Sequence, residues 1–142
     1  MDSTDPQIVY TDEGRAEDRD RIAQCLSEYN LRHGPDPGFR MLGLLLRSKE
    51  GETVGGLWGR SAYDWLFIDF LVVPAPLRGT GLGTRLMRQA EAIARERGCI
   101  GVWLDTFSFQ ALPFYRKLGY SVFGELRDYP RGNSRTWLAK RL

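Results

Sequence analysis

Apolar residues recur at two different periods along the chain, and the change of period predicts where helices and strands lie. Ile22, Cys25, Leu26 and Tyr29 follow helical spacing and predict a helix that ends before the Gly/Pro-rich segment 34–38. A short strand is predicted at 8–10, ahead of that helix. Three apolar segments separated by short turns predict an antiparallel meander of strands at 41–47, 53–60 and 65–73.

The second half of the chain predicts a further helix that is longer and better defined. Leu82, Leu86, Ala90 and Ile93 form one helical stripe, with Thr80 as the expected N-cap and Gly98 as the C-terminal glycine. Additional elements follow, and they comprise a strand at 101–106, a short helix at 110–118 and a strand pair at 120–126 and 135–140. This order of elements predicts an α/β domain that mixes parallel and antiparallel pairing.

Composition narrows the class of protein. The 142 residues are expected to form a single domain, 1–142, and the net charge of +2 does not indicate a nucleic-acid binder. The two cysteines fit no zinc or dithiol motif, so no metal site is expected and the thiols predict a reducing, cytoplasmic location. The acidic start of the chain and its short apolar runs do not predict a membrane segment.

The segment from Leu71 to Thr84 joins a predicted strand to the long helix through a glycine-rich turn. Glycines at 79, 81 and 83 permit close approach to a ligand, and the first turn of the helix offers free N–H donors to an anion such as pyrophosphate. Arg78 adds a charge at the mouth of this loop. The loop lacks the Gly-Lys-Ser/Thr of the nucleotide P-loop and the spacing of the dinucleotide fingerprint, although a purely structural turn is left open.

Two motifs together indicate a family. The sequence Arg78-Gly79-Thr80-Gly81-Leu82-Gly83 resembles the Arg/Gln-x-x-Gly-x-Gly/Ala acyl-CoA loop of the GNAT superfamily of N-acetyltransferases, and 111–120 (ALPFYRKLGY) resembles that family's second signature. The resemblance implies a mixed, mostly antiparallel central sheet flanked by helices. It also implies that the sheet is splayed between two central parallel strands, one ending at Val73 and one beginning at Gly101.

The resemblance further implies acetyl-CoA as cofactor and assigns residues to it. The strand end would pair with the pantetheine arm and supply an oxyanion N–H, and the glycine loop would hold the phosphates. Ser108 stands where the family commonly has asparagine. The full set of expected coenzyme residues is Leu71, Val72, Val73, Arg78, Gly79, Thr80, Gly81, Leu82, Gly83, Thr84, Ser108 and Tyr115.

Acetyl transfer to an amine needs a proton acceptor for the amine and a proton donor for the departing thiolate. The resemblance gives Tyr115 the role of acid. Asp69, two residues before Leu71 on a predicted strand, is the candidate base, and Asp105 is its rival as a carboxylate that binds the amine. Aromatic residues near the strand ends and this second carboxylate are expected to bind the substrate, namely Trp58, Tyr63, Trp65, Asp105 and Phe107.

These observations favour an N-acetyltransferase that moves an acetyl group from acetyl-CoA directly to a primary amine of a small molecule. Two alternatives stay open, a protein lysine or N-terminal acetyltransferase and a non-catalytic acyl-CoA sensor. The expected partner is therefore a small-molecule amine, without nucleic acid or membrane. The resemblance leaves a homodimer open, and the sequence does not identify the acceptor.

Overall fold

The computed structural model describes residues 5–142, which divide into two compact units at Asp36/Pro37. The first unit contains α1 (Ala16–His33), so the helix predicted from the apolar spacing at 22–29 is confirmed. The strand predicted at 8–10 is wrong, because these residues lie in neither helix nor strand. A strand needs a partner for its backbone hydrogen bonds, and no other strand lies in the described part of this unit.

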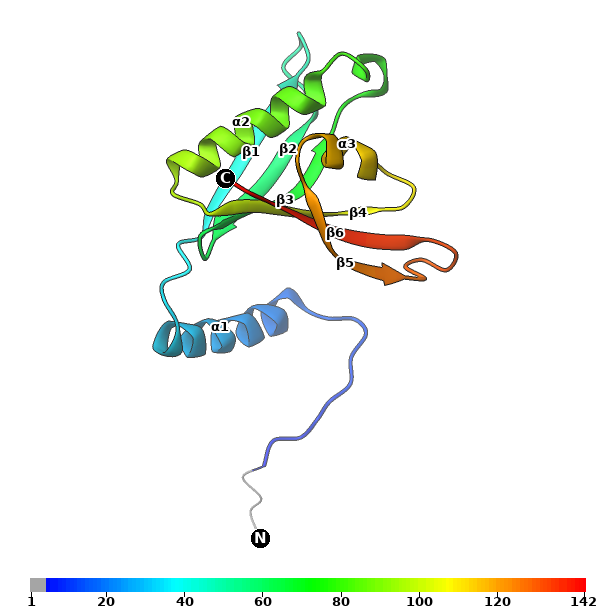
Figure 1. Cartoon of the computed structure of the whole chain (residues 1–142). Coiled ribbons are helices and arrows are strands. Elements are labelled where there is room, and N and C mark those ends of the chain that lie inside the picture. The colour runs from blue at the N-terminus through cyan, green and yellow to red at the C-terminus, as the bar shows by residue number, and fades with distance from the viewer. Residues whose placement is uncertain (1–4) are drawn as a thin grey trace. The chain divides into compact units, whose positions relative to one another are not determined.

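The second unit is a six-stranded sheet with the order β1-β2-β3-β4-β6-β5 (Figure 1). β3 and β4 are parallel and the other neighbours are antiparallel, which confirms the expected mixed sheet. The strands are β1 (Arg40–Arg47), β2 (Thr53–Ala62), β3 (Trp65–Val72), β4 (Gly101–Phe107), β5 (Ser121–Arg127) and β6 (Ser134–Arg141). The helices are the short 3-10 turn η1 (Ala75–Leu77), α2 (Leu82–Glu96) and α3 (Leu112–Lys117).

The two parallel strands separate at their C-terminal ends. β3 pairs with β4 only from Trp65, opposite Gly101, to Ile68, opposite Leu104, although both strands continue beyond these positions. On its other side, β3 pairs with β2 through a register shift that leaves Asp69 as the extra, unpaired residue of a bulge. The sheet is therefore open between the ends of β3 and β4, as expected from the resemblance.

The core lies between the sheet and α2, which crosses one face of the sheet in Figure 1. Met87, Ala90 and Ala94 of the helix are buried, together with alternate side chains of the strands such as Leu66 and Leu104. Because successive side chains of a strand point to opposite faces, the residues between the buried positions of β4 lie on the other face of the sheet. Those residues are Trp103, Asp105 and Phe107.

One charged group is buried in this core. Glu91 of α2 is 1% exposed, and its carboxylate accepts hydrogen bonds from Lys140 Nζ at 3.1 Å, from the Tyr120 hydroxyl at 2.9 Å and from Arg88 at 3.1 Å. Burial and the Glu91 charge together raise the pKa of Tyr120, so its hydroxyl stays protonated and keeps donating. The cluster links α2 to β6 and to Tyr120, the residue that precedes β5.

We expect Glu91→Ala to lower the free energy of unfolding by about 3 kcal/mol, because it leaves the partly buried Lys140 ammonium without its counter-charge. Urea denaturation followed by circular dichroism measures this change. Glu96→Ala, at an exposed position of the same helix, is the matched control, with an expected change below about 0.5 kcal/mol. Equal midpoints for the two variants would show that the cluster does not stabilise the fold.

Candidate active site

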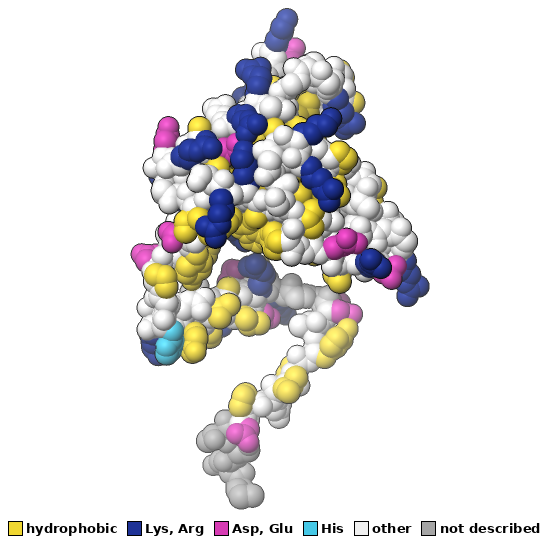
Figure 2. All heavy atoms as spheres, viewed as in Figure 1, with side chains coloured by type: hydrophobic (Ala, Val, Ile, Leu, Met, Phe, Trp, Pro, Cys, Tyr) yellow, Lys and Arg dark blue, Asp and Glu magenta, His cyan; other side chains and the backbone are white. Residues whose placement is uncertain are grey.

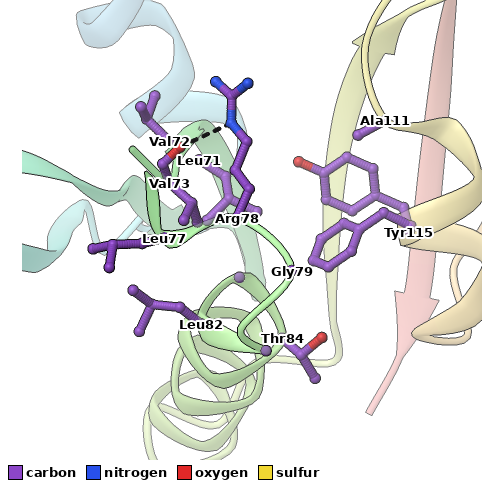
Figure 3. Close-up of a pocket in the computed structure, with 13 residues that line it drawn as sticks. Leu71, Val72, Val73, Leu77, Arg78, Gly79, Leu82, Thr84, Ala111 and Tyr115 are labelled. Atoms are coloured by element: carbon purple, nitrogen blue, oxygen red, sulfur yellow. Dashed lines mark hydrogen bonds between the residues drawn. The ribbon is translucent and has the colours of Figure 1, made fainter. Parts of the chain in front are cut away.

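A cavity of about 580 Å³ lies where the end of β3, the glycine loop and α3 meet (Figure 3). The structure brings most of the expected coenzyme residues to its wall. Ten of them line it, namely Leu71, Val72, Val73, Arg78, Gly79, Gly81, Leu82, Gly83, Thr84 and Tyr115. Thr80 and Ser108 are not among the residues of this wall.

The backbone of the glycine loop explains why glycine stands at 79 and 81. Both residues have left-handed φ angles, +79° and +82°, which side chains with a Cβ rarely adopt. Gly81 is the N-cap of α2 and offers no capping side chain, so the N–H donors of the first turn keep their capacity for a ligand. The expectation that Thr80 caps this helix is wrong, because the N-cap is Gly81 and no side chain accepts a hydrogen bond from the first turn. The Thr80 hydroxyl donates instead to the Leu77 carbonyl at 2.6 Å and ties the loop to η1.

Gly83 and Arg78 complete the loop in different ways. A Cβ at Gly83 would lie 3.3 Å from the Phe114 ring, so glycine at this position lets the start of α2 approach α3 closely. Arg78 donates from Nε to the Val73 carbonyl at 3.2 Å, shown as the dashed line in Figure 3. Within residues 5–142 its two terminal amino groups make no hydrogen bond, so they are available to an anion at the mouth of the cavity.

Basic side chains surround this part of the sheet unit. Figure 2 shows Lys and Arg gathered over the region of α2 and α3. The two helices carry Arg85, Arg88, Arg95, Arg116 and Lys117. Of these, Arg85 lies in the first turns of α2, whereas Arg95 lies in its last turn and Arg88 is paired with Glu91. A helix N-terminus without a capping side chain, preceded by Arg78 and followed by Arg85, fits a polyanionic group such as a pyrophosphate.

Tyr115 is the buried polar residue of the cavity. It is 8% exposed, and Figure 3 shows its hydroxyl directed across the cavity toward the end of β3. Burial, and to a lesser extent the charge of Asp105, raise the pKa of Tyr115 to about 12. The phenol is therefore protonated at neutral pH and can donate a hydrogen bond to a developing anion.

A second cavity, of about 420 Å³, lies against the first. Leu71, Val72, Ala111 and Tyr115 line both cavities, so the two spaces meet at the separated ends of β3 and β4. The second cavity also holds the two candidate carboxylates and three phenylalanines, and its distinctive lining residues are Phe67, Asp69, Phe70, Asp105, Phe107 and Arg135. This arrangement offers one space to an acyl donor and a separate space to its acceptor.

The two carboxylates differ in their partners. Asp105 Oδ1 accepts a hydrogen bond from Arg135 Nε at 2.8 Å, and Nη2 of the same guanidinium lies 2.8 Å from this oxygen in an ion pair. The pairing raises the pKa of the guanidinium. Asp69, the bulge residue of β3, forms no side-chain hydrogen bond or ion pair within the described part of the chain. Of these two carboxylates, Asp69 is the one free to take a proton or a cation.

Three of the expected substrate residues and one expected coenzyme residue lie outside these two cavities. Tyr63 and Trp65 line a groove at the start of β3. Trp58 lines a separate surface hollow together with Phe70. Ser108 is bound to the loop between β5 and β6, where its hydroxyl donates to Asn133 at 3.0 Å and accepts from the Ser134 N–H at 3.1 Å. The structure does not bring these four residues to either of the two cavities that meet at Tyr115.

Sequence reasoning missed several residues that line the two cavities, and three of them are important for the geometry of the site. Ala111 lines both cavities, and the carboxamide oxygen of Gln110 accepts from the Phe107 N–H at 2.8 Å, which holds the turn before α3. Arg135 is the third. Arg135 belongs to the last strand, β6, and it reaches Asp105 because β6 pairs with β4. No local sequence pattern predicts that pairing.

Comparison with known proteins identifies the class that this fold and site define. Residues 6–120 match the model of the acetyltransferase (GNAT) family, and the chain belongs to that family. It is 37% identical to the acetyltransferase Atu2258 of Agrobacterium fabrum over 94% of this chain and 98% of that protein. It is 46% identical to the blasticidin-S acetyltransferase of Streptomyces morookaense over 66% of this chain and 70% of that protein.

A solved structure agrees with the sequence comparisons. A crystal structure assigned to an acetyltransferase from Agrobacterium tumefaciens has a TM-score of 0.93 and 36% identity, and the match covers 96% of this chain and all of that chain. The protein is thus an N-acetyltransferase that uses acetyl-CoA. Within residues 5–142, no helix has the length and apolar character needed to span a membrane, and no group of three potential metal ligands occurs.

The raised pKa of Tyr115 predicts the pH dependence of turnover. If the protonated phenol is required, activity falls only as pH approaches about 12, whereas a tyrosine of ordinary pKa would be half ionised at about pH 10. We therefore expect kcat, measured with saturating substrates, to rise as the amine loses its proton and then to stay level to pH 10.5. A kcat that falls to half its plateau value near pH 10 would instead show that Tyr115 has the pKa of an ordinary tyrosine.

Proposed function

We propose that this enzyme transfers the acetyl group of acetyl-CoA directly to a primary amine of a small molecule. The observation that supports this function is the meeting of two cavities at one protonated tyrosine, with a free carboxylate in the second cavity. The similarity to a Streptomyces morookaense protein named for the acetylation of blasticidin S gives the proposal further support.

In this proposal, the first cavity takes the coenzyme. The uncapped first turn of α2 and the terminal amino groups of Arg78 bind the pyrophosphate. The edge of β3 beyond Ile68 has no pairing with β4, so its backbone groups can pair with the amides of the pantetheine arm. The acetyl carbonyl then reaches the junction of the two cavities, where an N–H near Val73 stabilises the charge on its oxygen.

The second cavity takes the amine. Asp69 accepts the proton of the ammonium group through water, and the neutral nitrogen attacks the thioester carbon. The new C–N bond forms as the C–S bond breaks, and the surplus proton of the attacking nitrogen passes to the departing sulfur, so that an amide and a free thiol result. Tyr115 donates a hydrogen bond to the departing thiolate. Because a thiol has an ordinary pKa of about 8.5, below that of this phenol, stabilisation of the thiolate is sufficient and full proton transfer is not required.

Direct transfer is favoured because neither cavity has a nucleophilic thiol on its wall. Cys25 belongs to α1 in the first unit, and Cys99 lines neither cavity. We also propose that the two compact units form one acetyltransferase domain. The family match spans 6–120 and crosses the boundary at Asp36/Pro37, which supports that view.

The proposal is tested by release of coenzyme A thiol from acetyl-CoA with a panel that contains small primary amines, blasticidin S and lysine peptides. Acetylation of a small amine with kcat/KM well above that of the peptides is the expected result. Turnover of peptides alone would replace the proposal with protein acetylation. Tight coenzyme binding, measured by calorimetry, without turnover of any acceptor would favour a sensor.

The role of Asp69 is tested with the accepted amine. We expect Asp69→Asn to lower kcat/KM for the amine about tenfold at pH 7, while the KM for acetyl-CoA stays unchanged because the phosphate loop is intact. The deficit should shrink at pH 9, where more of the amine is already neutral. A deficit that is equal at both pH values would assign Asp69 to substrate binding rather than to proton removal.

A further inference from the structure

The acceptor cavity contains two carboxylates, but an arginine neutralises one of them. Arg135 donates from Nε to Oδ1 of Asp105 at 2.8 Å, and its Nη2 forms an ion pair with the same oxygen at 2.8 Å. The two side chains are 26% and 14% exposed, so the pair is partly shielded from water and is screened less than a surface pair. The cavity therefore presents one free negative charge, at Asp69, in place of two.

The arginine is fixed by more than its partner carboxylate. Its Nη1 donates to the Tyr129 hydroxyl at 3.1 Å, and its guanidinium carbon lies between 5.1 and 5.3 Å from the ring centres of Phe107, Tyr129 and Trp137. Cation–π contacts of this kind hold a planar guanidinium in one position. These contacts hold the Arg135 guanidinium beside Asp105, so the negative charge of this carboxylate is neutralised by a side chain with a fixed position.

We propose that Arg135 determines the charge selectivity of the acceptor site, favouring an amine that carries a single positive charge over one that carries two. This inference rests on the proposed function, because it concerns the amine that enters the second cavity. Asp69 and Asp105 are the carboxylates in the wall of the cavity, and Asp105 is already paired with Arg135. Once one ammonium group of the acceptor binds at Asp69, a second ammonium group has no carboxylate to pair with. If Arg135 were absent, Asp105 would offer that second group a partner.

The test uses two probe amines of equal length that differ in one charge, 1-aminobutane and 1,4-diaminobutane. The quantity measured is the ratio of kcat/KM for the diamine to kcat/KM for the monoamine. Any general change in folding, coenzyme binding or base strength alters both values and cancels from the ratio. We expect Arg135→Gln to raise this ratio roughly three- to tenfold, the size of effect that a partly exposed ion pair gives.

Two further variants separate charge from structure. The double variant Asp105→Asn with Arg135→Gln lacks both charges and is expected to return the ratio to within about twofold of the wild-type value. Arg135→Lys retains the positive charge but loses the planar fork, and is expected to keep the wild-type ratio even if its thermal stability falls. Thermal melting of each variant with acetyl-CoA present reports on folding independently.

The outcomes distinguish this inference from the proposed function. A ratio that does not change in Arg135→Gln, or that rises equally in the double variant, would overturn the role of Arg135 while leaving amine acetylation intact. A ratio that rises as much in Arg135→Lys would show that charge is not the determinant. Wild-type enzyme that turns over neither amine would count against alkylamine acceptors, and the inference would fall with them.

Discussion

Replacement of Tyr115 by phenylalanine is expected to lower kcat about 100-fold, the size of effect that loss of one hydrogen-bond donor to a developing anion gives. The hydroxyl faces the junction of the two cavities and is protonated at neutral pH, so its loss removes a donor to the leaving thiolate. Because the phosphate loop is on other elements, the Kd for acetyl-CoA should change less than about threefold. Stopped-flow thiol release and calorimetry measure the two quantities.

Tyr120→Phe is the matched control for this variant. Tyr120 is also buried, at 3% exposed, and its ring makes an edge contact with Tyr115, but its hydroxyl is bound to Glu91 and lines neither cavity. Its loss should reduce stability with kcat within about threefold of wild type. Equal losses of kcat in the two variants would assign Tyr115 to packing.

The second large effect is expected at Gly81. Gly81→Asp should weaken acetyl-CoA binding about 100-fold or more, roughly 3 kcal/mol, because a carboxylate then lies at the N-terminus of α2 beside the phosphates. Gly81→Asn is the control. Asparagine tolerates the left-handed conformation better than other residues with a side chain and has nearly the same shape without the charge.

The comparison of these two variants isolates electrostatics from backbone strain. We expect Gly81→Asn to bind acetyl-CoA within about fivefold of wild type, so that most of the loss in Gly81→Asp comes from charge repulsion. This repulsion should decrease as salt is raised. Calorimetric titration at low and high ionic strength provides the measurement. Similar losses in both variants would locate the effect in the shape of the loop and not in an anion site.

The parts of the site that the sequence predicts well are local. The glycine spacing of 79–83, the stripe of α2 and the position of Tyr115 all depend on residues close together in the chain. The expected N-cap is wrong because the N-cap of the helix is Gly81, one residue after Thr80, whose hydroxyl donates to Leu77. Sequence alone does not fix the exact residue at which a helix begins.

The parts that could not be predicted depend on pairing between distant segments. Ser108 is bound to Asn133, 25 positions away, and Asp105 meets Arg135 only because β6 pairs with β4 in one register. Tyr63 and Trp65 were placed correctly in or beside a strand, but they lie at the end where β3 and β4 are still paired. Which strand end opens to ligands is a property of the whole sheet.

The junction of the two cavities has a consequence for how the enzyme is inhibited. The two cavities have mostly different walls, and the residues common to both are Leu71, Val72, Ala111 and Tyr115. A compound that fills the acceptor space alone can therefore bind while the coenzyme remains in place, so it should compete with the amine and not with acetyl-CoA. A single molecule that fills both cavities would need a linker that passes Tyr115, where the two spaces meet.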